Sequence, residues 1–284
     1  MALPRRQFLS TAAGLWTVPA LLGLAEPGRA VAATEPAVPA EPVPATPVPP
    51  VTPGYPAQDA ALAREMVTVA HGNAARVREL LEVSPALAKA AWDWGFGDWE
   101  TALGAASHMG NREIAALLLE NGARPDLFTF AMLGQLDVVK ACVAARPGIQ
   151  KTLGPHGLTL LHHARKGGEE AAPLVAWPES LGDADQGYVN APLTDAEKAG
   201  YVGDFAFGPG PADRFTVGLA KDGGLVLKRA PDGTNRGLFH QGGGQFHPPG
   251  NPAMRIRFTP AGEKATALTV TEGARVLAAT RVAG

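Results

Sequence analysis

The stretch Glu100 to Asp126, ETALGAASHMGNREIAALLLENGARPD, decides the first half of the fold. It predicts two short helices joined at Gly110-Asn111, because glycine tolerates the left-handed backbone that such a turn needs. Thr101 is suited to cap the first helix with its hydroxyl. Since this unit exposes an apolar stripe, it needs neighbours that cover it. The stripe lies on the second helix at i, i+3, i+4 spacing: Ile114, Leu117 and Leu118.

The residues of this stretch also resemble a known repeat. Residues 101–106 (TALGAA) fall where ankyrin repeats carry T-P-L-H-x-A, and residues 159–164 (TLLHHA) are a closer match. Comparable turns are expected at Gly72-Asn73, Gly134 and Gly167-Gly168. The resemblance implies a short array of degenerate ankyrin-like repeats over residues 59–182, with an unrelated helical bundle as the alternative.

The first 33 residues resemble a twin-arginine signal peptide. Arg5-Arg6 is followed by Phe8-Leu9, an apolar run and the small residues Ala30-Val31-Ala32, which suit a cleavage site. The resemblance implies export of an already folded chain and a periplasmic or secreted location. The apolar run is too short for a stable anchor, so no membrane span is expected in the mature chain.

Residues 34–58 are expected to form a Pro/Ala-rich disordered linker, because proline lacks a backbone donor and favours extended geometry. Beyond the linker, the two predicted domains differ in their numbers of basic and acidic side chains. Residues 59–200 contain 12 basic and 18 acidic side chains, and residues 201–284 contain 10 basic and 6 acidic ones. The two halves could therefore attract each other, while neither has the dense basic face of a nucleic-acid binder.

After a connecting segment at 183–200, the pattern changes to the alternation of strands. Phe215 and Val217 share a face, residues 221–224 (KDGG) form a turn, and Met254, Ile256 and Phe258 alternate with arginines. Seven or eight short antiparallel strands over residues 201–284 predict a small β-barrel built as a meander. The predicted fold class is α + β in two domains, with the helical repeat array followed by this barrel.

The C-terminal stretch has a weaker resemblance of its own. Residues 201–205 (YVGDF), Phe246, and Arg257-Phe258 followed by alternating strands are similar to the small lipocalin-like domain appended to serine-β-lactamase-like peptidases. That domain offers no shared catalytic residue. The chain's serines lie outside G-x-S-x-G and have no lysine three positions later, so the peptidase chemistry is not expected here.

The sequence gives little indication of any other catalytic or metal-binding site. The motifs H-E-x-x-H, C-x-x-C and G-x-x-x-x-G-K-[ST] are absent from the sequence. His162 falls on the structural histidine of the ankyrin motif, and His163 is expected to point elsewhere, towards solvent. His240 and His247 could meet across neighbouring strands and form a metal site with His163 or Asp204, but a surface role is favoured. We therefore assign no catalytic residue, no metal ligand and no cofactor.

The sequence favours a non-enzymatic exported protein that holds a protein partner through its repeats. The expected binding residues lie just before Thr101, in the hairpin that projects from an ankyrin-like stack: Trp92, Trp94, Phe96 and Trp99. Alternatively, this aromatic face packs on the barrel or on the first repeat. Two other functions remain open: a carrier of a small apolar ligand in the barrel, and an enzyme with an unrecognised site between the domains.

Overall fold

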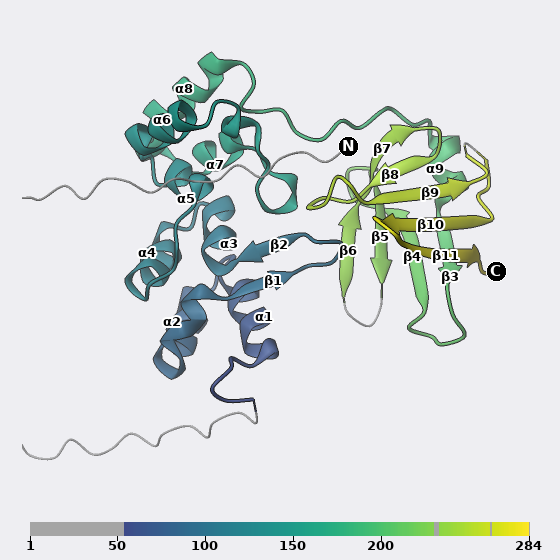
Figure 1. The fold of residues 1–284 in the computed structure, drawn as a ribbon, viewed down its shortest axis with the longest axis horizontal. Coiled ribbons are helices and arrows are strands. Elements are labelled where there is room, and N and C mark those ends of the chain that lie inside the picture. The colour runs from purple at the N-terminus through teal and green to yellow at the C-terminus, as the bar shows by residue number, and fades with distance from the viewer. Residues whose placement is uncertain (1–53, 230–232, 262, 284) are drawn as a thin grey trace, which may run out of the picture. The chain divides into compact units, whose positions relative to one another are not determined.

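The computed structural model describes residues 54–229, 233–261 and 263–283. The predicted signal at 1–33 and the linker up to residue 53 lie outside the described residues. The described chain contains a helical region followed by an antiparallel sheet (Figure 1), so the predicted α + β class is confirmed. Among the described residues, none of the helices combines the length and apolarity needed to cross a membrane.

The helical region consists of consecutive helix pairs joined by short turns. The pairs are α1 (Ala60–Val69) with α2 (Ala74–Val83), α3 (Ala102–Met109) with α4 (Arg112–Glu120), α5 (Leu127–Met132) with α6 (Leu136–Ala145), and α7 (Leu160–Lys166) with α8 (Ala172–Leu181). Short 3-10 turns connect them: η1 (Pro85–Lys89), η2 (Ile149–Lys151), η3 (Pro155–Gly157) and η4 (Glu169–Ala171).

Capping side chains and glycine residues set the ends of α3. The hydroxyl of Thr101 accepts a hydrogen bond from the backbone N–H of Gly104, which is the predicted N-cap of α3. Gly110 ends the same helix with φ 74°, and a side chain there would overlap the backbone oxygen of Lys166. Pro178 lies inside α8 without interrupting it, and it is buried.

A two-stranded hairpin projects between the first and second helix pairs. Its strands β1 (Ala91–Asp93) and β2 (Trp99–Thr101) are antiparallel, with Trp92 opposite Glu100. The connecting loop turns through left-handed residues, including Phe96 at φ 61°. The hairpin lies where the sequence predicts it, directly before the Thr101 cap.

The C-terminal region forms a nearly closed, barrel-like sheet preceded by α9 (Asp195–Tyr201). Its spatial order is β6-β5-β4-β3-β11-β10-β9-β8-β7, and all of its pairings are antiparallel. Only Leu238 separates the edge strands β6 and β7 along the chain. The strands are β3 (Gly203–Ala206), β4 (Arg214–Leu219), β5 (Leu225–Arg229), β6 (Thr234–Gly237), β7 (Phe239–Gly242), β8 (Gln245–His247), β9 (Arg255–Thr259), β10 (Ala267–Glu272) and β11 (Arg275–Arg281).

Aromatic side chains fill the interior of the sheet. Phe258 lies 4.8 Å from Tyr201, 5.4 Å from Phe246 and 5.7 Å from Phe205 between ring centroids. All four rings are at most 1% exposed. Phe215 and Ile256 belong to the same packed cluster. A small barrel leaves little space once its own side chains fill it.

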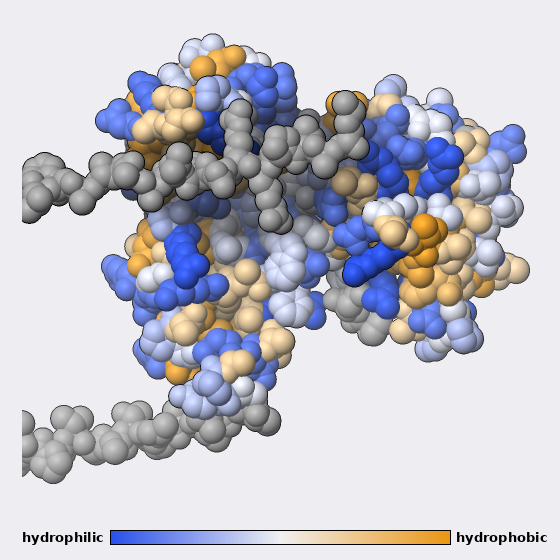
Figure 2. All heavy atoms as spheres, in the orientation of Figure 1, coloured by the Kyte–Doolittle hydropathy of each residue, from blue (hydrophilic) through white to orange (hydrophobic). Residues whose placement is uncertain are grey.

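Large exposed apolar side chains are spread over different elements of the described chain. They include Trp99 in β2, Leu219 in β4 and Val276 in β11. On the face shown in Figure 2, hydrophobic and hydrophilic residues are interspersed over both helices and sheet. Scattered apolar side chains of this kind are normal on a protein surface.

Candidate metal centre

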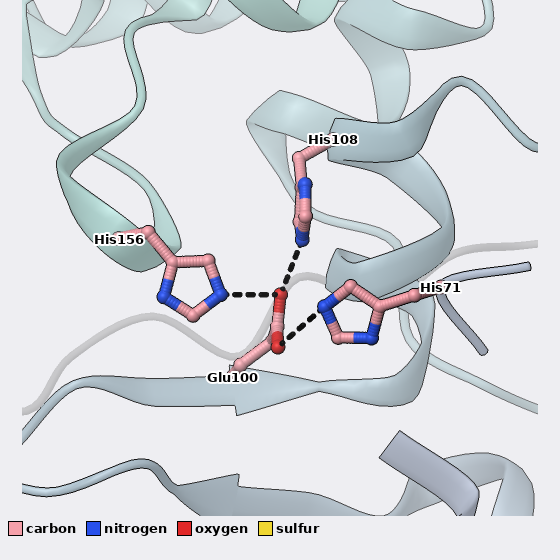
Figure 3. Close-up of side chains that lie close together, drawn as sticks. All are labelled: His71, Glu100, His108 and His156. Atoms are coloured by element: carbon pink, nitrogen blue, oxygen red, sulfur yellow. Dashed lines mark ion pairs between the residues drawn. The ribbon is translucent and has the colours of Figure 1, made fainter. Parts of the chain in front are cut away.

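Four polar side chains from separate segments converge on one point (Figure 3). They are His71, just after α1, Glu100 in β2, His108 in the last turn of α3, and His156 in η3. One ligand atom from each, a ring nitrogen or a carboxylate oxygen, can be chosen so that all four lie within 4.8 Å of one another. Imidazole and carboxylate groups gathered in this way are the usual ligands of transition metals.

Glu100 reaches the centre because of strand alternation. It is the middle residue of β2, and it is buried whereas its two neighbours in the strand are exposed. Its carboxylate Oε2 accepts a hydrogen bond of 2.7 Å from Nε1 of Trp94, which lies across the hairpin. This bond fixes the carboxylate and leaves Oε1 directed at two of the histidines (Figure 3).

His71 and His108 lie at the C-terminal ends of the first helices of two pairs. Nδ1 of His71 is 3.0 Å from the carbonyl oxygen of Val67 and 3.1 Å from that of Thr68. Since a carbonyl oxygen only accepts, Nδ1 carries hydrogen and the neutral ring keeps its lone pair on Nε2. That Nε2 is 3.5 Å from Oε2 of Glu100, and Nε2 of His108 is 2.8 Å from Oε1.

His156 adopts the left-handed conformation, with φ 60° and ψ 13°. This backbone costs a residue other than glycine about 1–2 kcal/mol. Asp98 stabilises it, because its carboxylate accepts the backbone N–H of His156 at 2.9 Å and lies 2.7 Å from Nδ1 of the ring. Nε2 of His156 then lies 3.4 Å from Oε1 of Glu100. A histidine held through its other nitrogen by a carboxylate is typical of metal ligands.

Residues of the sheet contact Asp98 in turn. Nε of Arg236 in β6 donates a 3.0 Å hydrogen bond to the carbonyl oxygen of Trp94 and lies 3.6 Å from Oδ2 of Asp98. Gly250, between β8 and β9, packs so closely that a side chain there would overlap Cα of Asp98. The aspartate is therefore confined between the sheet and His156, and is 1% exposed.

The electrostatics of the centre favour charged groups. Burial raises the pKa of Glu100, but contacts with His108 and His156 outweigh it and bring this pKa to about 2. Burial lowers the pKa of His156, whereas its contacts with Asp98 and Glu100 raise it to about 9. Without a metal ion, the centre at neutral pH therefore contains an ionised Glu100 and a protonated His156.

Two buried polar atoms of the centre lack a hydrogen bond. Oε1 of Glu100 and Nε2 of His108 are both buried and lie 2.8 Å apart, yet they do not meet in hydrogen-bond geometry and have no other hydrogen-bond partner. A buried polar atom without a partner costs about 1–3 kcal/mol. A cation bonded to both atoms would satisfy them together.

The centre opens to solvent on one side. The side chains of His71 and His156 are 30% and 25% exposed, while Glu100 is fully buried and His108 is 9% exposed. The rings of His71 and His156 face each other at a centroid distance of 6.4 Å.

The structure separates the four aromatic residues predicted to bind a partner. Trp92 packs on the first helix core beneath Arg64, and Trp94 supports Glu100. Phe96 packs on the core of the sheet, 6.4 Å from Phe215. Trp99 alone among the four is exposed, at 64%.

The predicted roles of the other histidines need correction. His163 is fully buried against Phe128, not exposed, and burial lowers its pKa to about 4. His240 and His247 do not face each other, because each lies opposite a phenylalanine in the β7–β8 pairing. His162 contacts the carbonyl oxygen of His108 at 3.3 Å, a contact within the helical region.

Sequence reasoning did not find this candidate metal centre, although its residues lie near the turns and caps of the helix pairs. Histidines precede the turns at Gly72 and Gly110, and the other two ligands precede the capping threonines Thr101 and Thr159. The offsets are one and two residues from the turns and one and three residues from the caps, so the signal is loose. The sequence reasoning considered other histidines and did not consider these four residues as ligands.

Comparison with known proteins adds no family to this description. No family model matches the chain, and no curated protein matches its sequence significantly. The assignment of the site therefore rests on its geometry.

Proposed function

We propose that this chain binds a divalent transition-metal ion of the zinc class through His71, Glu100, His108 and His156. One observation carries the proposal: three imidazole Nε2 atoms surround one buried carboxylate, while other protein groups hold the remaining polar atoms of Glu100, His71 and His156. Such second-shell bonds orient metal ligands before the ion arrives.

A purely ionic role for the cluster fits less well. A proton on His156 compensates the charge of Glu100, but it leaves Nε2 of His108 buried without a hydrogen-bond partner. A metal ion uses all four groups. Three imidazoles and one carboxylate favour zinc and its neighbours over magnesium or calcium, which prefer sites made of oxygen ligands.

The proposal extends to where the ion is acquired. The twin-arginine-like signal at residues 1–33 supports export of the folded chain to the periplasm or beyond. The four ligands come together only in the folded chain, since they lie on different segments. An exported chain of this kind would acquire its ion before or after export, but in either case once folded.

The exposed ring of Trp99 supports a second candidate function, the binding of a protein partner by an ankyrin-like array. Consecutive helix pairs, the second of which is preceded by a hairpin, support the resemblance to ankyrin repeats. Trp92, Trp94 and Phe96 pack against other residues of this chain. Of the four aromatic residues, Trp99 is therefore the one proposed to anchor a partner. Replacing Trp99 by alanine should leave the melting temperature unchanged and weaken capture of a periplasmic partner; unchanged capture would refute the role.

The metal proposal is tested on the mature chain, stripped with a chelator and titrated with Zn²⁺ and with Co²⁺. We expect one ion per chain, with visible absorption bands for the cobalt form. His108→Ala and Glu100→Gln should abolish tight binding, because each removes a ligand. His240→Ala removes a histidine of the sheet and should bind normally. Failure of the parent chain to bind either ion would refute the function.

A further inference from the structure

Arg236 of the sheet contacts two residues that support the proposed metal centre. Arg236 lies in β6, an edge strand of the sheet, and its side chain is 14% exposed beside the loop of the hairpin, residues 94–98. It bonds the carbonyl oxygen of Trp94, lies 3.6 Å from Asp98, and lies 5.8 Å from the centre of the Trp94 ring. None of these atoms belongs to a proposed ligand.

Both groups that Arg236 touches hold a ligand in place. Trp94 donates to Oε2 of Glu100, and Asp98 accepts from Nδ1 and the backbone of His156. Two of the four ligands are therefore oriented by residues that the same guanidinium fixes. Further contacts join the hairpin and the sheet: Phe96 packs on Phe215, and Gly250 packs on Asp98.

We propose that Arg236 is a positioning residue that couples metal binding to the contact between the hairpin 91–101 and the sheet. This inference rests on the proposed metal-binding function and adds its regulation. Coupling between two equilibria is reciprocal. If the arginine contact raises the metal affinity by some factor, metal binding stabilises the arginine contact by the same factor. A partner or ligand that displaced β6 would then release the ion.

Geometry and charge can be separated by choice of variant. Arg236→Lys keeps the positive charge near Asp98 but lacks the planar guanidinium whose Nε donates to the Trp94 carbonyl oxygen. Arg257→Lys is a matched control, since Arg257 is an exposed arginine of β9 in the same sheet.

The experiment measures Co²⁺ affinity by chelator competition and records the visible spectrum of each mature variant. We expect Arg236→Lys to weaken binding about tenfold, the usual effect of losing a second-shell partner, and to alter the cobalt bands. Arg257→Lys should change neither. A merely structural arginine would lower the melting temperatures of the metal-free and loaded forms equally and leave the spectrum unchanged, which would overturn the proposal.

Hydrogen exchange of the parent chain provides the reciprocal measurement, which does not depend on the folding of any variant. Co²⁺ should slow exchange in β6 (Thr234–Gly237) as well as in the hairpin. Slowing in the hairpin alone would overturn the coupling and leave metal binding intact. Absence of cobalt binding by the parent chain would refute the metal site and the coupling with it.

Discussion

The carboxylate of Asp98 holds His156 by two contacts at once, accepting its backbone N–H at 2.9 Å and lying 2.7 Å from Nδ1 of its ring. Asp98 lies in the hairpin that also provides Glu100, whereas His156 lies more than fifty residues later in the chain. The aspartate thus fixes both the strained backbone of His156 and the tautomer that directs Nε2 at Glu100.

Asp98→Asn tests this arrangement directly. The amide can still accept one hydrogen bond, but it cannot accept both the backbone and the ring of His156 with the strength of a carboxylate. We expect Zn²⁺ affinity to fall between about tenfold and a hundredfold. Asp93→Asn is the matched control, because Asp93 caps the hairpin loop at Gly95 without touching a proposed ligand. Equal affinities in the two variants would contradict the role of Asp98.

Metal affinity should depend on pH through His156. Its pKa is raised to about 9 by Asp98 and Glu100, so at neutral pH a proton must leave before Nε2 can bind an ion. We expect the affinity to rise about tenfold for each pH unit between 7 and 8 and to level off above pH 9. Titration calorimetry in buffers of different ionisation enthalpy should show release of about one proton. Constant affinity from pH 7 to 8 would rule out this competition.

The stability of the chain should fall in mild acid because of His163. Burial lowers the pKa of His163 to about 4, so the unfolded chain takes up a proton near pH 6.5 that the folded chain resists. The stability that the neutral, buried ring of His163 contributes is fully present above pH 6.5 and is lost as the pH falls towards 4. At pH 5 the loss is roughly 2 kcal/mol.

Urea unfolding at pH 7 and pH 5 measures this loss. In His163→Asn, which removes the titrating ring, the difference in unfolding free energy between the two pH values should shrink by about that amount. The variant itself should be less stable at both pH values, because it loses the contact with Phe128. An unchanged difference would mean that another group causes the acid sensitivity.

Gly250→Ala should damage the metal centre without altering any ligand. Its φ is 88°, and a methyl group there would overlap Cα of Asp98. Gly242→Ala is a close control, with φ 95° and no atom within 4 Å of the added carbon. Both variants carry the same backbone strain of about 1 kcal/mol, so only Gly250→Ala should weaken metal binding as well. Melting curves with and without Zn²⁺ separate the two effects, and equal metal-dependent shifts would contradict the expected difference.

Export is predicted to require the arginine pair. Replacing Arg5 and Arg6 by lysine keeps the charge and removes the motif that the export receptor reads. The precursor should then remain in the cytoplasm, as seen by fractionation and immunoblotting. Normal periplasmic yield of this variant would refute twin-arginine export.

Local sequence was enough to predict several elements of the secondary structure. Thr101 caps its helix, Gly110 ends it in the left-handed conformation, and the alternation of Ile256 and Phe258 gives a strand with one buried face. These features depend on neighbours a few residues away, through capping, backbone sterics and side-chain periodicity. Apart from the pairing of β3 with β11, the sheet pairs consecutive antiparallel strands, for which adjacency in sequence predicts pairing.

The proposed metal centre could not be predicted in the same way. His71, Glu100, His108 and His156 carry no spacing that a local rule recognises, and the sequence alone led us to consider His240 and His247 instead. Only the stacking of the helix pairs, the hairpin that turns Glu100 inward, and the left-handed turn at His156 bring their polar atoms within 4.8 Å. Helices, turns and strands follow from short-range sterics, whereas the meeting of four ligands follows from packing between distant segments.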